Sequence, residues 1–152
     1  MRYAAILLLT LAVGSARFSQ TAKHIAFHDS PEVKTPPGFS HAAVVSGGRL
    51  VFVSGQVGRD KQGKMPPDFR GQAAGAFANL KAVLAAAGAK PQDVVKLNYY
   101  VVGMNHEKLV ALREVRDQWL AGAHPPTSTL AGVQALAQED IQVEIEAVAA
   151  LP

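Results

Sequence analysis

Two carboxylates, Glu144 and Glu146, stand two residues apart in the run IQVEIEAVA near the end of the chain. Apolar and polar residues alternate there, which is typical of a strand and puts both carboxylates on one face, about 6–7 Å apart. A solvated face is the ordinary interpretation of such a pair. Val148 continues the same face, so one carboxylate would be partly desolvated, which raises its pKa and lets it act as a base near neutral pH.

A second candidate lies at the end of another strand-like run, VFVSGQVG, where Ser54, Gly55 and Gln56 follow one another. A glycine at the end of a strand lets its backbone N–H approach a ligand closely. The carboxylate of a small substrate could accept a hydrogen bond from that donor. An ordinary bulge or turn explains the same residues equally well.

Several familiar kinds of site are missing from the sequence. It contains no Gly-rich phosphate loop, no GxSxG elbow and no HExxH motif. His24 and His28 have the spacing of a metal pair on a helix, but they lie in an irregular stretch with no third ligand nearby, so we expect no metal site. Cysteine is absent, which excludes disulfides, thiolate metal sites and cysteine nucleophiles.

Length and composition indicate one globular domain: the chain has 152 residues, of which 49% are hydrophobic and 18% charged. The net charge is +3, and no cluster of Lys and Arg is interleaved with aromatic residues. Nucleic acid is therefore not an expected partner, although this mild basic balance leaves weak binding open.

The first 16 residues predict a signal peptide, because Arg2 precedes a short apolar run over 4–13 and small residues follow at 14–16. A frayed helix or a start assigned too early are the alternatives. A working signal would place the mature chain, from Arg17, in the periplasm or outside the cell; otherwise the protein would be cytoplasmic. We expect no membrane contact after signal removal. Residues 17–37 look irregular, and 38–152 form the predicted domain.

The elements that must position these residues follow the order β-β-α-β-α-β-β. Gly47 and Gly48 predict a hairpin between the first two strands, while Asp68 and Asn105 are predicted N-caps of the two helices. Gly88 is predicted to end the first helix. The expected strands cover 41–46, 49–55, 93–104, 127–136 and 140–149, and the expected helices 69–87 and 106–120.

An α+β fold with a mixed sheet and both helices on one face is the economical packing of these elements. Two helices cannot cover both faces of the sheet. The other face would still carry apolar side chains such as Val101 and Val148, and a bare apolar face usually binds a partner. We therefore expect an oligomer.

These motifs together resemble the Rid family, the reactive intermediate deaminases of the YjgF type. The resemblance rests on SGQ at 54–56, on QAAGAFANLKAVLAAAGAKPQDVVKLNYYVV at 72–102 and on VEIEAVA at 143–149, and it runs from about Gly38 to Leu151. It implies a chorismate-mutase-like fold and a homotrimer whose sheets form a central barrel, with three ligand clefts between subunits.

The resemblance also implies an activity. Archetypal members hydrolyse enamines and imines, such as 2-iminopropanoate, to 2-oxo acids and ammonia, and they use no metal or cofactor. In those members an arginine pairs with the substrate carboxylate, a glycine N–H after the serine of SGQ helps to hold the substrate, and a glutamate in the last strand orients the attacking water.

Most of these roles have a counterpart in this sequence. By resemblance, Glu144 is the catalytic glutamate, and Ser54, Gly55 and Gln56 are the substrate-binding SGQ motif. The aromatic residue of a Gly-Pro-Tyr-Ser stretch corresponds to Phe39 in PGFS, which keeps the ring and lacks the hydroxyl.

The arginine is the departure from the pattern. The family has Pro-x-Arg-Ser before its penultimate strand, whereas this chain has Pro126-Thr127-Ser128-Thr129, so Ser128 stands where the arginine is expected. A hydroxyl cannot replace a bidentate guanidinium, and the loss should cost about 2–5 kcal/mol of affinity for a small carboxylate. Ser128 and Thr129 remain candidate substrate ligands. Arg113, in the second helix, either restores a positive charge to the cleft or is an exposed helix residue.

Two functions from different classes follow. One is an exported deaminase that hydrolyses reactive enamines or imines, with Glu144 positioning water. The alternative is a non-catalytic exported trimer that binds a small ligand or a partner, which the missing arginine favours. RNA cleavage, proposed for some Rid proteins, ranks below both because the sequence shows no basic groove and no acid–base histidine pair.

Overall fold

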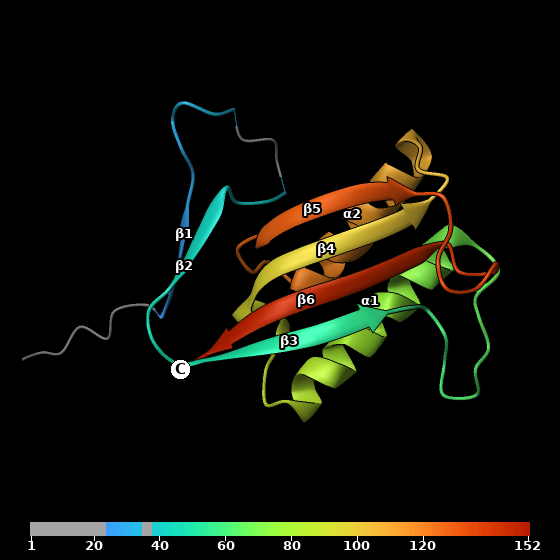
Figure 1. Ribbon diagram of the computed structural model, residues 1–152, viewed down its shortest axis with the longest axis horizontal. Coiled ribbons are helices and arrows are strands. Elements are labelled where there is room, and N and C mark those ends of the chain that lie inside the picture. Colours follow the sequence, from blue (N-terminus) through green and yellow to red (C-terminus); the bar gives the residue numbers. More distant parts are fainter. Residues whose placement is uncertain (1–23, 35–37) are drawn as a thin grey trace, which may run out of the picture.

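The computed structural model describes residues 24–34 and 38–152 (Figure 1). The predicted signal peptide over residues 1–16 lies outside the described residues. The two helices are α1 (Phe69–Ala86) and α2 (His106–Leu120), with a short 3-10 turn, η1 (Pro91–Asp93), between them. The strands are β1 (Ile25–His28), β2 (Ala42–Val45), β3 (Arg49–Gln56), β4 (Val94–Val102), β5 (Thr127–Val133) and β6 (Val143–Leu151).

A mixed four-stranded sheet in the order β3-β6-β4-β5 forms the centre of the molecule. The last strand, β6, lies between β3 and β4 and is antiparallel to both, whereas β4 and β5 are parallel. Figure 1 shows α1 and α2 together behind this sheet. The predicted α+β architecture, with both helices on one face of a mixed sheet, is thus confirmed.

Both predicted helix caps are present. The Asp68 carboxylate accepts a hydrogen bond from the Gly71 N–H at 2.9 Å, and the Asn105 side chain accepts one from the Lys108 N–H at 2.9 Å. These bonds satisfy backbone donors that a first helical turn leaves free. Gly88 has a φ of +78° directly after the first helix, as a C-terminal glycine requires.

The core lies between the helices and the sheet. Alternate residues of β4 and β6 point into it, among them Leu97, Val101 and Ile145, and each of these three is fully buried. Phe77 of α1 packs against Trp119 of α2 with ring centroids 5.1 Å apart, which joins the two helices over the sheet. Val101 therefore belongs to the helix-covered face, and its predicted place on the other face is wrong.

The predicted hairpin around Gly47 and Gly48 is also wrong. Both glycines have positive φ, 76° and 84°, and they turn the chain, but the strands on either side of them do not pair with each other. Instead β2 pairs with β1, while β3 pairs with β6. Part of the stretch predicted to be irregular, Ile25–His28, is thus a strand. Alternation within each run could not show these more distant partners.

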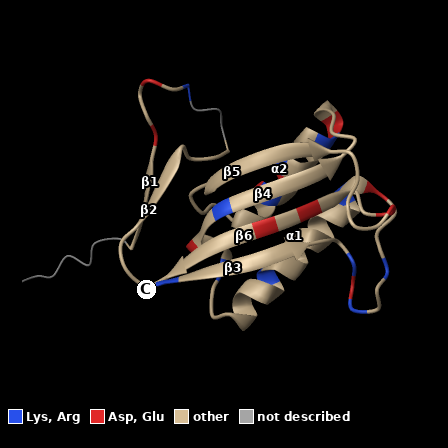
Figure 2. Cartoon of the chain, in the orientation of Figure 1, with Lys and Arg blue, Asp and Glu red and all other residues tan. Residues whose placement is uncertain are grey.

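The sheet face away from the helices, the open face, combines apolar and charged residues. Its apolar part includes Leu50 and Phe52, which are 52% and 76% exposed, together with Val148 of the neighbouring β6. Its charged part contains Glu144 and Glu146, and Figure 2 marks the acidic positions along β6 in red, in the middle of the sheet. An exposed apolar area of this kind usually binds a partner, and the apolar open face predicted from Val148 is present.

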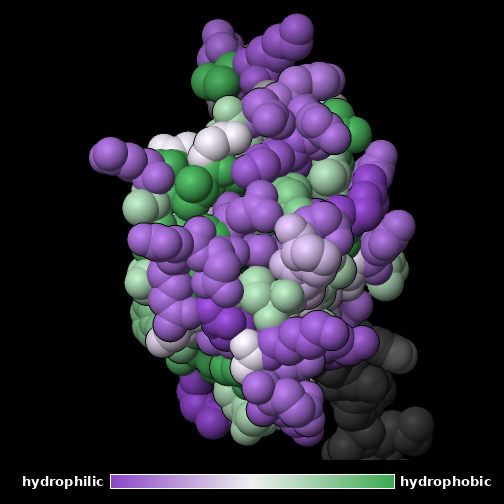
Figure 3. Space-filling model, turned by 90° about the vertical axis from the view of Figure 1, so that its right-hand side faces the viewer, coloured by the Kyte–Doolittle hydropathy of each residue, from purple (hydrophilic) through white to green (hydrophobic). Residues whose placement is uncertain are grey.

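The end of the molecule on the right of Figure 1, where the connections 57–68 and 134–142 lie, presents mainly hydrophilic residues (Figure 3). Within the described part of the chain, neither helix is both long and apolar enough to cross a membrane.

Candidate functional site

Glu144 lies directly against the backbone of Gly55. A Cβ atom added at Gly55 would overlap with the Glu144 carboxylate, so a side chain at position 55 would displace it. The contact arises from a bulge, because pairing with β6 skips from Val53 to Gln56 and two residues then face one. The Gln56 side-chain amide donates to the carbonyls of Ser54 and Gly55 at 3.1 and 3.3 Å, which holds this bend.

The second carboxylate, Glu146, is held by two donors from β4. Its Oε1 accepts hydrogen bonds from the Asn98 side-chain amide at 2.7 Å and from the Tyr100 hydroxyl at 2.9 Å. The hydrogen bond to Glu146 raises the pKa of Tyr100, with smaller contributions from burial and from the negative charges of Glu146 and Glu144. The two glutamates thus differ: the Glu146 carboxylate is anchored by its neighbours, whereas the Glu144 carboxylate has no hydrogen-bond partner among the described residues.

The loop after Gln56 is fixed to the rest of the domain. The Asn79 amide of α1 donates to the carbonyls of Val57 and Arg59, both at 2.8 Å. Arg59 in turn donates to both carboxylate oxygens of Asp140, at 2.7 and 2.8 Å, and so ties this loop to the segment that leads into β6. These contacts set the position of β3 relative to β6, and with it the contact between Gly55 and Glu144.

A second group of predicted site residues lies on the other side of the sheet. Phe39, Arg113 and Ser128 line one cavity of about 120 Å³ between β5 and α2, together with Tyr99 and Arg116. We call it the arginine cavity. Ser128, the serine at the expected arginine position, and Arg113 line the same cavity. This is what the alternative in which Arg113 restores a positive charge to the cleft requires.

Phe39 reaches this cavity because its segment is docked on the loop before β5. The Ser40 hydroxyl donates to the Pro125 carbonyl at 2.7 Å, and the Ser40 N–H donates to the Pro126 carbonyl at 3.2 Å. Phe27 of β1 stacks on His124 of the same loop, with ring centroids 4.7 Å apart. The N-terminal segment therefore forms one wall of the arginine cavity.

Thr129 lies apart from Ser128 because neighbouring residues of a strand point to opposite faces. Its hydroxyl accepts a hydrogen bond from the Lys96 ammonium at 2.8 Å on the open face. Ser54, at the edge of that face, lines a separate cavity of about 270 Å³ with Phe52, Asn98 and Glu146. The predicted site residues thus form two groups on opposite faces of the sheet.

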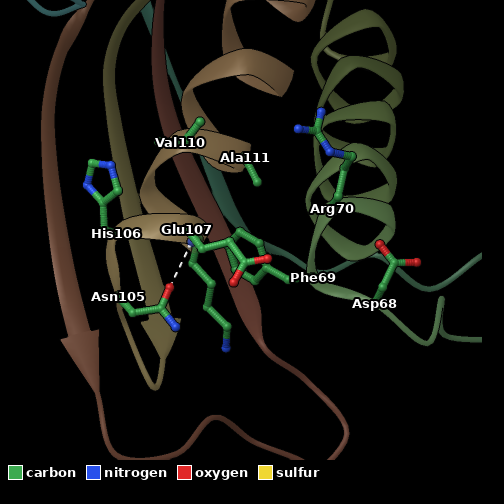
Figure 4. A pocket seen from close by; sticks show the side chains of 9 residues that line it. Asp68, Phe69, Arg70, Asn105, His106, Glu107, Val110 and Ala111 are labelled. Carbon is green, nitrogen blue, oxygen red and sulfur yellow. Dashed lines mark hydrogen bonds between the residues drawn. The ribbon is translucent and has the colours of Figure 1, made fainter.

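A further cavity contains none of the predicted site residues. It has a volume of about 550 Å³ and lies between the first turns of α1 and α2, where Phe69, Glu107 and Ala111 are among its lining residues (Figure 4). Asp68 and Asn105 already bond the backbone donors of these turns. Within residues 24–34 and 38–152, no three His, Asp or Glu side chains come close enough to hold a metal ion.

Sequence reasoning missed four residues at the two groups. Asn98 and Tyr100 could have been found from alternation in LNYYVV, which puts them on the face opposite Leu97. Arg116 could have been found from its helical spacing, four residues after Leu112 and four before Leu120. For Tyr99 alternation gives only a place on the same strand face as Leu97 and Val101, and its position beside the arginine cavity needs the structure.

The fold and these two groups define a Rid-type α+β protein. A family model described as Endoribonuclease L-PSP matches residues 30–151, and the chain therefore belongs to this family, which includes the Rid proteins. The predicted family membership is confirmed.

Three relatives illustrate the similarity. A Rid family protein of unknown function from Yersinia pestis, YyfB, is 37% identical, with a TM-score of 0.78 over 84% of this chain and 99% of that chain. A 2-iminobutanoate/2-iminopropanoate deaminase from Dermatophagoides farinae is 34% identical over 71% of this chain and 83% of its own. The structure of Escherichia coli TdcF with bound serine is 31% identical, with a TM-score of 0.64 over 71% of this chain and 85% of that chain.

Proposed function

We propose that this protein is a hydrolytic deaminase of reactive imines and enamines. The observation that supports this best is the Glu144 carboxylate lying against the Gly55 backbone. A carboxylate free of side-chain partners can hold a water molecule, and a bulged backbone leaves donors outside the ladder that can hold a substrate. A deaminase of 2-imino acids is among the relatives of this chain.

The proposed reaction needs one base that later acts as an acid. Glu144 accepts a proton from water while the water oxygen attacks the imine carbon, and it returns this proton to the nitrogen, which gives a neutral tetrahedral carbinolamine. Glu144 then takes the hydroxyl proton of the carbinolamine and delivers it to the nitrogen, so that the C–N bond breaks, the C=O bond forms and ammonia leaves. For a 2-imino acid, one water is consumed, and a 2-oxo acid and ammonia are formed. Such proton transfer typically contributes about 10²–10⁴-fold to a rate.

We also propose that the active protein is a homotrimer. Phe52 and Leu50 leave an apolar area on the open face, and association of three sheets would cover it. The group around Glu144 and the group around Ser128 lie on opposite faces of one subunit, so contact between subunits is a way to join them in one cleft.

The first test measures turnover. An amino-acid oxidase produces 2-iminopropanoate from alanine while semicarbazide competes for the imine, and semicarbazone formation is recorded with and without the purified protein. We expect the protein to suppress semicarbazone formation. No suppression by a folded trimer would contradict hydrolysis of this imino acid.

Glu144→Gln and Glu146→Gln form a matched pair for the same assay, because both replace a glutamate on the same face of β6. Glu144→Gln should lower the rate by about 10²-fold or more, as loss of a general base does. Glu146→Gln should keep most of it, because Glu146 is already bound to Asn98 and Tyr100. Equal effects of the two changes would remove the proposed role of Glu144.

Ser128 in place of the expected arginine favours a second candidate function, a non-catalytic protein that binds a small ligand. This candidate predicts ligand binding without turnover, and it predicts that Glu144→Gln leaves binding unchanged. Incubation with RNA is a third arm of the experiment, because the matched family carries the description of an endoribonuclease.

The trimer is tested by Phe52→Lys, which places a charge in the centre of the apolar area. We expect a smaller particle in analytical ultracentrifugation, because an unpaired charge is costly in a buried interface. Lys61→Glu, a charge change in the exposed loop after β3, is the control and should leave the mass unchanged. Export is a separate proposal, which N-terminal sequencing of the protein from cell fractions would check.

A further inference from the structure

The arginine cavity is a positively charged recess that the catalytic scheme above does not use. Both Arg113 and Arg116 line it, and no acidic residue does. Its volume of about 120 Å³ is well below the roughly 300–1,000 Å³ of sites for drug-sized ligands. The cavity therefore suits a small anion rather than a nucleotide.

Arg116 is the buried charge of this cavity, with 7% of its surface exposed. Its Nε and Nη2 atoms donate to Asp117 Oδ1 at 2.9 and 2.7 Å. A guanidinium has five N–H donors; Tyr99 lies close enough to take one of the donors that Asp117 leaves free, and the rest have no partner within the described part of the chain. Gly38 packs on this guanidinium so closely that a Cβ at position 38 would overlap with it.

Two hydroxyl groups lie next to Arg116. Tyr99 is 3% exposed, and its hydroxyl makes no hydrogen bond of ordinary distance and angle with another described residue, although it lies near enough to the Arg116 guanidinium for this donor to lower its pKa. Burial raises the pKa of Tyr99 and the neighbouring Arg116 charge opposes this rise, so the phenol is a neutral donor at physiological pH. The Ser128 hydroxyl likewise makes no side-chain hydrogen bond with another described residue, and both side chains line the cavity. An unpaired buried hydroxyl is costly, so it usually indicates a missing partner.

We propose that Arg116, with the hydroxyls of Tyr99 and Ser128, binds the carboxylate of a small 2-imino acid. The guanidinium on α2 thus replaces the arginine that the family pattern places at position 128. The inference rests on the proposed function and specifies its substrate class. It makes the substrate an anion, although the uncharged Ser128 alone could not pair with one.

Arg116 fits this role better than Arg113 because it is buried. A charge-assisted hydrogen bond is stronger where water is excluded, whereas an exposed charge is screened. Arg113 is exposed on α2 and adds positive potential at the cavity mouth.

Asp117 does not neutralise the site. Its side chain is 63% exposed and bonds one edge of the guanidinium through a single oxygen. A substrate carboxylate can use the donors that remain, as the planar fork of arginine allows.

Binding is tested with pyruvate, the 2-oxo acid that the proposed reaction forms, and with methyl pyruvate, which has nearly the same shape but no charge. Ligand-observed NMR with the purified protein gives the affinity of each. We expect pyruvate to bind at least about tenfold more tightly than methyl pyruvate, since a hydrogen bond to a charged group is typically worth about tenfold or more. Equal affinities, or no pyruvate binding, would overturn the proposal.

Three variants locate the subsite. Arg116→Met should weaken pyruvate binding by at least about tenfold, and Tyr99→Phe by a smaller factor, because the first removes a charged donor and the second a neutral one. Arg113→Gln should have the smallest effect. A folded Arg116→Met protein that binds pyruvate like the unchanged protein would overturn the proposal.

Asp117→Asn is the alternative variant if Arg116→Met fails to fold. Because Asp117 is largely exposed, this change should leave the fold intact. This change releases the guanidinium from its carboxylate, so pyruvate affinity should rise several-fold. Unchanged or weaker binding would contradict the assignment of Arg116. Inorganic phosphate is the comparison anion, and tighter binding of phosphate than of pyruvate would also contradict the carboxylate class.

These measurements separate the inference from the proposed function, because binding is measured without turnover. If pyruvate binds through Arg116 but no imine is hydrolysed, the subsite is confirmed and the deaminase is wrong. If 2-iminopropanoate is hydrolysed and Arg116→Met leaves its KM unchanged, the deaminase is confirmed and the subsite is wrong.

Discussion

The two groups of site residues are built differently. On the open face, strand register and the missing side chain at Gly55 position the Glu144 carboxylate. In the arginine cavity beside Ser128, the positive charge comes from arginine side chains of the helix α2. The first arrangement follows the family pattern residue by residue. The second lacks the expected arginine but contains Arg116, which comes from a different element. The comparison suggests that a position fixed by backbone pairing is hard to move, while a charge at the end of a long side chain can be supplied from any element that borders the same cavity.

The strongest way to break the open-face arrangement is Gly55→Ala. The new Cβ would overlap with the Glu144 carboxylate and displace it, and a displacement of about 1 Å can cost about 10²-fold in rate. We expect a loss of this size in the semicarbazide assay. Ser54→Ala is the neighbouring control and should have a much smaller effect. A fully active Gly55→Ala enzyme would show that Glu144 does not need this position.

The support of the open-face group is tested by Asn79→Ala. This change leaves the carbonyls of Val57 and Arg59 without their donor, so the free energy of unfolding should fall by about 1–3 kcal/mol. Urea denaturation measures the change, and turnover should fall with it because the loop after Gln56 loosens. Gln62→Ala, in the same loop with an exposed side chain, should change neither quantity.

Ser128→Arg tests the helix-supplied charge from the other direction. If Arg116 already serves the cavity, the new side chain fills a space of about 120 Å³ and adds like charge, so pyruvate affinity should fall several-fold. The double change Ser128→Arg/Arg116→Ala should recover it. A single Ser128→Arg variant that binds pyruvate tenfold more tightly would show that the cavity lacked its arginine.

The smallest expected effect concerns Glu146, the carboxylate that Asn98 and Tyr100 hold. The hydrogen bond between Glu146 and Tyr100 raises the pKa of Tyr100 above the ordinary value of 10.0. The interaction therefore stabilises the fold below about pH 10, and this contribution is lost as the pH rises through the folded-state pKa. Glu146→Gln should lower the pKa of Tyr100 in a titration followed by tyrosinate absorbance. Glu144→Gln should lower it less, because the charge of Glu144 is the smallest of the causes.

The predictable parts of the structure are those that local residues determine. Asp68, Asn105 and Gly88 predicted the helix ends because caps and left-handed turns depend on a few neighbouring residues. Alternation predicted the shared face of Glu144 and Glu146 for the same reason. The β1–β2 pair was missed because partner choice depends on residues far apart in the sequence, and Gly47–Gly48 fits a turn whichever strands it joins.

The candidate site could be predicted only in part. The resemblance supplied Gly55 and Glu144, and the structure shows them in contact. It could not supply Arg116. The family pattern compares residues position by position, so it shows that the arginine is missing at position 128 and does not show which other element provides one. Helical spacing does place Arg116 near the apolar stripe of α2, but the docking of Gly38 and Phe39 against the same cavity is a tertiary feature.

The position of β6 in the sheet has a consequence for the order of folding. This strand is the last of the chain, yet it lies between β3 and β4 and pairs with both. During synthesis β3 has no partner in this sheet, and β4 can pair only with β5, until β6 has left the ribosome, so the helices pack against an incomplete sheet before then. Such long-range pairing slows folding and leaves strand edges open to aggregation. A stop codon at the start of β6, near Val143, would therefore prevent closure of the sheet although all other strands and both helices would have been made.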